Sequence, residues 1–334
     1  MSTFYVIFAY LCLALLIVFL SMKLSDYIDL LDKKTKISGA FLGGVLLAAV
    51  TSLPEMFTSI SAVLFLNETG MVIGNILGSN LFDVLILGLC ILMFYKNYSR
   101  CELYSASHLS VVVGLVGMYS CMMLSLFLGE EFQLKIGSFN LCFLAIAVIY
   151  AFTIYKMPKN DSEDKDESID KPMKGDRLSV KQIVVRFVGC SLALVATSIF
   201  ITYVTNDLAK MFNLTASTAG VLFLAIATSL PEVVSTIALC AKGNFDAGFG
   251  NILGSCLFNV FVLSLTELLS FKTSILIPMD FESIKLVLLN MVTVGVSIVI
   301  ILLKSSKKDI KYKKPIEMSL ASITILLYLL YYIV

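Results

Sequence analysis

The sequence has few of the residues on which most enzyme active sites and protein metal cofactors depend. It contains one histidine, His108, and its eight cysteines are scattered without a Cys-x-x-Cys or Cys/His spacing. This pattern argues against structural zinc, a disulfide framework and histidine-based catalysis. No nucleophile–histidine pair is present, so a membrane-bound hydrolase is a remote alternative. We expect neither an enzyme nor a bound cofactor.

Charge is scarce as well. Only 15% of the 334 residues are charged, 58% are hydrophobic, and the mean hydropathy is +0.93. Soluble domains have about 25% charged residues, and a membrane-spanning helix needs about 20 apolar ones. The sequence therefore predicts an all-α polytopic membrane protein of about ten transmembrane helices. The expected spans are 4–21, 37–66, 70–95, 107–128, 136–155, 182–205, 213–241, 246–270, 284–303 and 316–334.

The basic residues are distributed unevenly between the loops that join these spans. Twenty Lys and Arg residues fall in the loops of one side and four in the loops of the other. Because positively charged loops stay in the cytoplasm, the first side is predicted to be cytoplasmic. Both termini should then lie outside a cell (inner or plasma) membrane.

A five-residue motif, Thr-Ser-Leu-Pro-Glu, occurs at 51–55 and again at 228–232, each time within a long apolar stretch. A carboxylate at bilayer depth is costly, and it indicates function by default. The proline removes a backbone hydrogen bond, so we expect a broken helix at each motif. Hydroxyls of the motif share a helix face with its carboxylate, and such hard oxygen ligands suit Ca²⁺ and similar cations.

The repeat extends beyond the motif. Residues 43–55 align with 220–232, and the segment Gly-Asn-Ile-Leu-Gly-Ser at 74–79 recurs at 250–255. Five predicted spans separate each motif from its copy. Since five is odd, the two halves must be inverted relative to each other, which places a binding site near the midplane. The halves are expected at 1–156 (repeat about 39–95) and 182–334 (repeat about 216–270).

Polar residues follow each repeated segment at helical spacing. Asn75, Ser79 and Asp83 form one stripe, and the second copy has Asn251, Ser255 and Asn259. Interhelical hydrogen bonding alone could explain such stripes. Asp83 favours ion binding, because a third buried carboxylate adds nothing to packing and no Lys, Arg or His lies deep in these helices to neutralise it.

The stretch 157–181 mixes acidic and basic residues and has few apolar ones. We expect a flexible cytoplasmic linker here. A regulatory cation site is the alternative, but the stretch has no Asp-x-Asp-x-Asp-Gly pattern.

These paired segments resemble the two α-repeats of the cation/Ca²⁺ exchanger superfamily, in its sodium/calcium exchanger branch. The resemblance implies ten helices in two inverted halves, with the first and sixth helices sliding across a core of eight. It implies that Ca²⁺ is bound by Glu55, Glu232, Thr51 and Thr228. It assigns flanking Na⁺ sites to Ser52, Ser79, Ser229, Ser255 and the carbonyls of Ala48 and Ala225, with Asp83 and Asn259 lining the middle.

The sequence departs from the pattern of that superfamily in three ways. The usual glycine before Thr-Ser is Val50 in one copy and Ala227 in the other. The usual asparagine after Gly-Ser is present as Asn80 but replaced by Cys256. The single Asp of the Asp/Asn pair lies in the first repeat, which leaves ion number and potassium dependence open.

The function expected from these features is secondary-active exchange of Na⁺ for Ca²⁺ by alternating access. H⁺-coupled cation exchange through the same carboxylates is the alternative, and a passive cation channel or a membrane receptor is a less favoured one. The expected partners are Ca²⁺, Na⁺ (with H⁺ or K⁺ as alternatives) and the lipid bilayer, without nucleic acid.

Overall fold

The computed structural model describes residues 3–35, 47–101, 103, 105–132, 135–136, 139–156, 178–270, 274–275, 280–306 and 312–333. The predicted linker falls almost entirely outside the described residues, as does the start of the second predicted span. The elements of the first half are α1 (Thr3–Thr35), α3 (Leu47–Thr51), α4 (Leu53–Ser61), the π-helical segment η2 (Ala62–Leu66), α5 (Thr69–Met93), α6 (Tyr95–Arg100), α7 (Ser105–Phe132), strands β1 (Lys135–Ile136) and β2 (Phe139–Asn140), and α8 (Leu141–Lys156).

The second half has the same order of long helices, but its π-helical segment precedes the motif, whereas η2 follows it, and its described residues contain no counterpart of α6, β1 or β2. Its elements are α9 (Val180–Phe212), α10 (Ala216–Ala219), the π-helical segment η3 (Gly220–Ala225), α11 (Ile226–Ala241), α12 (Phe245–Leu269), α13 (Phe281–Ser305) and α14 (Lys313–Ile333). The all-helical fold class is confirmed. The only sheet among the described residues is the antiparallel pair β1–β2, with Lys135 opposite Asn140.

Eight helices within the described ranges are long and apolar enough to cross a membrane. Two shorter apolar stretches, Leu53–Leu66 and Leu141–Lys156, correspond to the second and fifth predicted spans. The chain is thus a multi-pass membrane protein, while the count of ten spans stays a prediction. Helices α1 and α9 are each 33 residues long. At 1.5 Å per residue this is about 50 Å, well beyond the ~30 Å hydrocarbon core.

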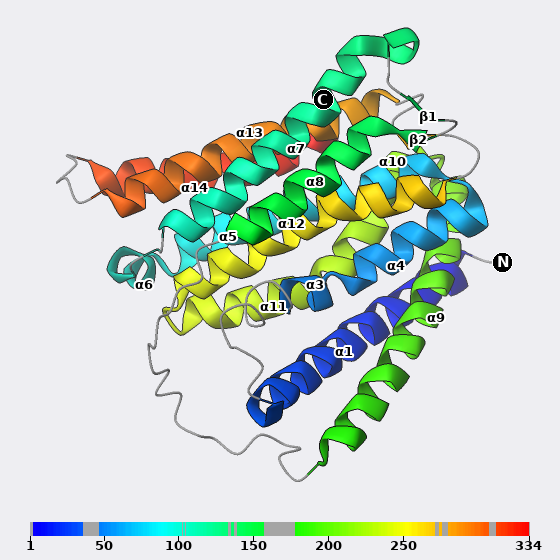
Figure 1. Cartoon of the computed structure of the whole chain (residues 1–334), viewed down its shortest axis with the longest axis horizontal. Helices are drawn as coiled ribbons and strands as arrows, with labels where there is room; N and C mark the ends of the chain where they lie inside the picture. The colour runs from blue at the N-terminus through cyan, green and yellow to red at the C-terminus, as the bar shows by residue number, and fades with distance from the viewer. Residues whose placement is uncertain are drawn as a thin grey trace.

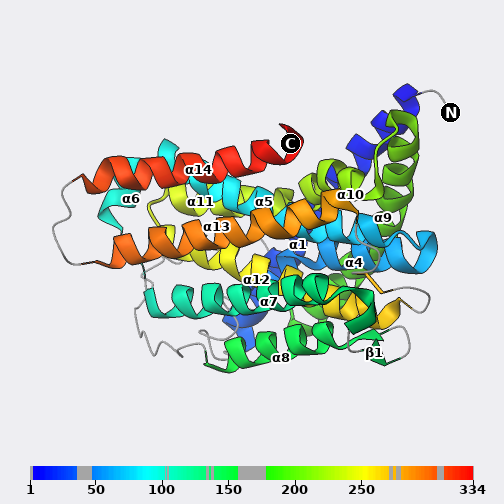
Figure 2. The same ribbon diagram turned by 90° about the horizontal axis from the view of Figure 1, so that it is seen from above.

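The two halves pack against each other with a two-fold pattern. Equivalent helices contact one another in three pairs: α1 with α9, α5 with α12, and α7 with α13. Other contacts occur twice with the halves exchanged: α1 packs on α11 as α9 packs on α4, and α14 packs on α5 as α8 packs on α12. Figure 1 shows α1 and α9 side by side at one edge, inclined to the other helices. In Figure 2, α14 and α8 lie on opposite flanks.

The direction of the helices shows that the repeat is inverted. Gly70 of α5 lies against Ser217, and Gly78 lies against Val221 and Ala225, so α5 runs parallel to the continuous segment α10–η3–α11. A short turn reverses the chain between α11 and α12, and another reverses it between η2 and α5. Helix α5 therefore runs opposite to its equivalent α12, and α4 runs opposite to α11.

The two motif prolines have different structural consequences. In the first half the helix is interrupted at Ser52, whose φ of −89° and ψ of 10° separate α3 from α4. In the second half α11 is continuous, and Pro231 lies inside it. A break was predicted at each motif proline. It is found in the first half only, and the prediction of a break at Pro231 is wrong. Proline is tolerated inside membrane helices where neighbouring groups and local π-helical adjustments satisfy the backbone, and η3 immediately precedes α11.

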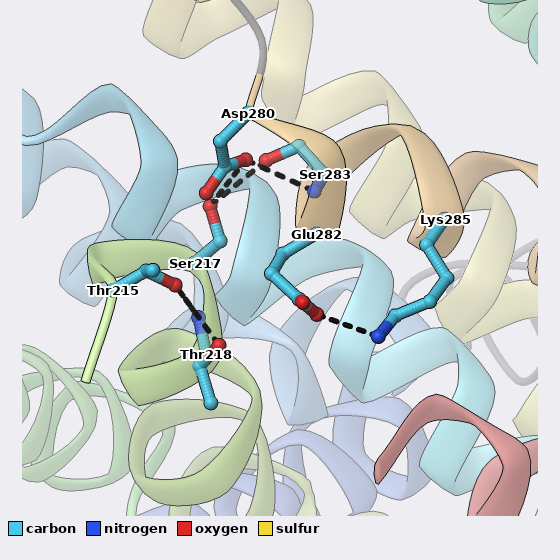
Figure 3. A network of polar contacts seen from close by, with 7 residues as sticks. All are labelled: Thr215, Ser217, Thr218, Asp280, Glu282, Ser283 and Lys285. Carbon is cyan, nitrogen blue, oxygen red and sulfur yellow. Dashed lines mark hydrogen bonds and ion pairs between the residues drawn. The ribbon is translucent and has the colours of Figure 1, made fainter. Parts of the chain in front are cut away.

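The segment that leads into α11 is anchored at its start. Ser217 donates a hydrogen bond to Asp280 Oδ1 (3.0 Å), and its hydroxyl also contacts that of Ser283 (2.8 Å). Figure 3 shows Asp280 capping α13, with the Glu282–Lys285 ion pair (2.8 Å) beginning in the first turn of the same helix. These bonds hold the second motif's helix to α13, which belongs to the surrounding scaffold.

Candidate ion-binding site

The two motif glutamates meet inside the protein although 177 positions separate them in the sequence. Both are fully buried, with 0% exposure. Ser229 Oγ donates to Glu55 Oε1 at 3.2 Å, and Ser52 Oγ donates to Glu232 Oε1 at 3.2 Å. Each carboxylate is thus held by the serine of the opposite motif, and these crosswise bonds follow the two-fold relation of the halves.

The other oxygen of each glutamate is left without a partner. Among the described residues, neither Glu55 Oε2 nor Glu232 Oε2 accepts a hydrogen bond. Asp83 is also fully buried, and neither of its carboxylate oxygens has a hydrogen-bond partner there. The three groups are close enough to interact electrostatically.

No described cationic side chain pairs with these acids. The ion pairs of the described residues are Lys23–Asp26, His108–Asp246 and Lys285–Glu282, none of which involves the three buried carboxyl groups. An unpaired buried charge is strongly destabilising. The carboxyl groups must therefore be neutralised by bound cations or by protons.

The remaining predicted ligands surround this centre. Ser52 Oγ lies 2.5 Å from Ser255 Oγ, which joins α12 to the first motif. Ser79 Oγ points to the carbonyl of Ala225 at 3.5 Å, as expected if both face one site. The structure thus brings four of the predicted oxygen ligands into contact in two pairs, each of which joins the two halves.

The two motif threonines form hydrogen bonds mainly within their own helices. Thr51 Oγ1 donates to the Ala48 carbonyl (3.1 Å). Thr228 Oγ1 donates to the Leu224 carbonyl (2.9 Å) and lies 3.4 Å from that of Ala225. Their lone pairs remain available to an ion, because a hydroxyl that donates one bond can still accept others.

Two asparagines that were predicted to line the stripes, but not to bind ions, support the site. Asn75 Nδ2 donates to Thr58 Oγ1 and Ser59 Oγ, both at 2.9 Å, and to the carbonyl of Glu55 at 3.2 Å. Asn251 makes the equivalent bonds to two hydroxyls of α11. Both asparagines belong to the repeated Gly-Asn segment, which was the available signal for this role.

Asn259 lies on α12 one turn after Ser255 and is fully buried. Among the described residues its Oδ1 has no hydrogen-bond partner, and its Nδ2 donates to Asn80 Oδ1 at 3.0 Å. By contrast, Glu267 of α12 is remote from this set. Its two oxygens accept backbone hydrogen bonds from Asn140 (2.9 Å) and Ile275 (2.7 Å), so it fixes the loops beside β2.

In the described part of the chain, no three His, Cys, Asp or Glu side chains are arranged to hold a metal by themselves. The donors at the centre are instead a mixture of carboxylates, hydroxyls, one amide oxygen and backbone carbonyls. Such a set offers hard oxygens with few formal charges, which suits Na⁺ and Ca²⁺ better than transition metals.

Comparison with known proteins bears on the class of this site. The profile of the family described as "Sodium/calcium exchanger protein" matches residues 5–156 and 182–334, which is nearly the whole chain. This chain belongs to that family. The exchanger is 29% identical to the inner membrane protein YrbG of Escherichia coli over 77% of each chain. It is 25% identical to the sodium/calcium exchanger MaX1 of Methanosarcina acetivorans, covering 96% of this chain and 98% of that one.

Solved structures share the fold. A structure titled as the H⁺/Ca²⁺ exchanger CAX has a TM-score of 0.70 at 15% identity, covering 98% of this chain and 87% of that one. A structure of the sodium-calcium exchanger NCX_Mj has a TM-score of 0.62 at 18% identity, covering 100% of this chain and 99% of that one. At these identities the likeness establishes the fold, and the resemblance inferred from the motifs is confirmed at the level of the family.

Proposed function

We propose that this family member is a secondary-active antiporter that exchanges Na⁺ for Ca²⁺ across a cell membrane. One observation carries the proposal: Glu55 and Glu232 are fully buried, held crosswise by Ser229 and Ser52, and each keeps one oxygen unpartnered within the described residues. Two such oxygens, with Asp83 beside them, form a centre that needs cationic charge and can release it when the halves move.

The proposed ligands follow the residues named from the sequence. Ca²⁺ is held by Glu55, Glu232, Thr51 and Thr228. Na⁺ is held by Ser52, Ser79, Ser229, Ser255 and the carbonyls of Ala48 and Ala225, with Asp83 and Asn259 lining the middle. Na⁺ and Ca²⁺ use overlapping oxygens, so the site holds one ion set or the other. That competition is what couples the two fluxes.

An H⁺-coupled Ca²⁺/cation exchanger is the second candidate. Asp83 favours it, since a buried carboxyl group without a hydrogen-bond donor is neutralised by a proton as readily as by a metal ion. The solved relative titled as an H⁺/Ca²⁺ exchanger has the same fold. In this mechanism the same three acids carry protons in one direction and Ca²⁺ in the other.

The experiment is Ca²⁺ uptake into proteoliposomes that contain the purified protein, with the counter-ion varied. An outward Na⁺ gradient should drive ⁴⁵Ca²⁺ uptake at constant pH, and a pH gradient without Na⁺ should drive none. Uptake driven by the pH gradient alone would replace Na⁺ by H⁺ in the proposal. Uptake that needs no counter-ion would indicate a passive channel. Adding K⁺ to either side tests potassium dependence in the same vesicles.

The topology is proposed from charge: both termini outside, and the linker 157–181 cytoplasmic. The halves 1–156 and 182–334 stay as predicted from the sequence. No resident cofactor is proposed, because the transported ions themselves are the only metals that the mechanism requires.

A further inference from the structure

Asn259 presents a problem that a carboxylate in its place would not. An amide offers an oxygen on one side and an NH₂ group on the other, and only the oxygen can bind a cation. Rotation by 180° would direct two N–H donors at the ion instead. Asn259 Nδ2 bonds to Asn80 Oδ1 at 3.0 Å, which leaves Oδ1 as the atom without a partner among the described residues.

The orientation of Asn80 is itself fixed. Its Nδ2 donates to the backbone carbonyl of Cys256 at 3.1 Å and to the Tyr119 hydroxyl at 2.9 Å. A rotated amide would place Oδ1 against that carbonyl oxygen, with no hydrogen between the two acceptors. The Asn80 amide oxygen must therefore face Asn259, and Asn259 must donate a hydrogen bond to it from Nδ2.

Two further residues extend this chain of bonds to the backbone of the scaffold. Tyr119 of α7 donates to Asn290 Oδ1 of α13 at 3.2 Å. Asn290 Nδ2 in turn donates to the carbonyls of Leu77 (3.0 Å) and Leu286 (2.9 Å). A backbone carbonyl oxygen can only accept a hydrogen bond, so the orientation of the Asn290 amide is fixed. Tyr119, Asn80 and Asn290 are each 1% exposed, so water does not compete for these bonds.

The positions related to Asn80 and Asn259 by exchanging the two halves carry a different pair of residues. Cys256 is the counterpart of Asn80, and Asp83 is the counterpart of Asn259. The Cys256 thiol is directed at the Asn80 backbone carbonyl (3.9 Å), and the Asp83 oxygens have no hydrogen-bond partner among the described residues. A carboxylate needs no such clamp, because both of its ends are oxygen.

We propose that Asn80 is a positioning residue that keeps the carbonyl oxygen of Asn259 turned toward the transported cation, with Tyr119 and Asn290 holding Asn80 in place. The two departures from the family pattern then have one cause: the half that faces the amide of Asn259 keeps the orienting asparagine, Asn80, and the half that faces the carboxylate of Asp83 has Cys256 at the equivalent position. The inference rests on the proposed function, in which Asn259 lines the ion site.

The test is a double-mutant cycle of Asn80→Cys and Asn259→Asp, which copies the chain's own Cys256/Asp83 combination onto the Asn80/Asn259 pair. The measurement is the KM for Ca²⁺ in counter-ion-driven uptake, together with the Ca²⁺ concentration that half-saturates the rise in unfolding temperature of the purified protein. Asn80→Cys should raise both by about 10–100-fold, the effect known for groups that orient a metal ligand. In the Asn259→Asp background the same substitution should raise them little.

Equal effects of Asn80→Cys in both backgrounds would overturn the proposal, because a purely structural role of Asn80 would not be relieved by a carboxylate at 259. Tyr119→Phe is the second variant, should Asn80→Cys fold poorly. With almost no change in side-chain volume, it removes one of the two hydrogen bonds that the Asn80 amide nitrogen donates. It should raise the KM for Ca²⁺ by a smaller factor than Asn80→Cys, and only where residue 259 is the native Asn. If Tyr119→Phe leaves the KM unchanged and Asn80→Cys has the same effect in both backgrounds, Asn80 does not orient Asn259.

The binding readout separates this inference from the proposed function. A protein that binds Ca²⁺ but transports none would refute the antiporter, and the cycle measured by unfolding temperature would still decide the role of Asn80. A protein whose unfolding temperature does not respond to Ca²⁺, Na⁺ or K⁺ would overturn both.

Discussion

The two halves of this exchanger contain the same five-residue motif, yet they fold it differently. In the first half Ser52 interrupts the helix before Pro54, whereas in the second the helix passes through Pro231 without interruption. The side chains nevertheless reach the same relation, with both crosswise Ser–Glu bonds at 3.2 Å. The motif therefore specifies the chemistry of the site, and the surroundings of each copy decide the backbone.

The repeated glycines give the same lesson. A methyl group at Gly74 would lie 2.1 Å from the backbone oxygen of Ser217, because α5 packs directly on the segment that leads into α11. At the equivalent Gly250 the nearest atom would be His108 Cε1 at 3.7 Å, an ordinary contact. Identical residues at two-fold-related positions thus face different neighbours.

The largest effect is expected from the acids, and it should be the same in both halves. Glu55→Gln and Glu232→Gln should each lower Ca²⁺ flux by about a hundredfold or more, since losing a ligand exceeds the 10–100-fold loss seen for groups that merely orient one. Uptake of ⁴⁵Ca²⁺ into proteoliposomes measures it. Glu282→Gln, which alters a partly exposed ion pair outside the site, is the matched control and should keep its flux.

Full retention of flux in either glutamate variant would remove that acid from the site. A large loss of Ca²⁺ flux in one variant and a small loss in the other would contradict the expected equivalence of the two halves, since Glu55 and Glu232 would then contribute unequally to transport.

The second expected effect is on stability, and it should differ between equivalent glycines of the two halves. Gly74→Ala should destabilise the protein by about 1–3 kcal/mol or more, because the added methyl group meets backbone that cannot move independently. Gly250→Ala adds only an ordinary contact with His108 and gains helix propensity, so the stability of this variant should be unchanged or higher. Thermal unfolding of the detergent-purified variants measures both. Similar unfolding temperatures for the two variants would contradict the close packing of α5 on η3.

The smallest effect should come from the serines. Ser229→Ala removes one hydrogen bond to Glu55, and Ser52→Ala removes both the bond to Glu232 and the contact with Ser255. A hydrogen bond to a charged group contributes about 1.5–3 kcal/mol, so ion affinity should fall on the order of tenfold for Ser229→Ala and further for Ser52→Ala. The KM for Ca²⁺ measures it. A larger loss for Ser229→Ala would reverse the predicted order.

Much of this architecture follows from local patterns in the sequence. Apolar runs of bilayer length predicted an all-helical membrane fold, and the offset between the two motifs predicted an inverted repeat, which the opposed directions of α5 and α12 bear out. Carboxylates inside apolar segments singled out Glu55, Glu232 and Asp83 as the unusual groups. These inferences needed only the lengths of apolar runs, the number of spans between the two motif copies and the residue types within each run, none of which depends on which helices pack together.

Tertiary structure alone decided which serine holds which glutamate, which proline breaks its helix, and how Asn259 is turned. Tyr119 and Asn290, which stand behind Asn80, carry no motif that could have marked them. The bonds of Asn80 and Asn259 join residues 39 to 179 positions apart. The hydrogen-bond partners of a buried polar group depend on which helices pack beside it, and no periodicity within a single helix contains that information.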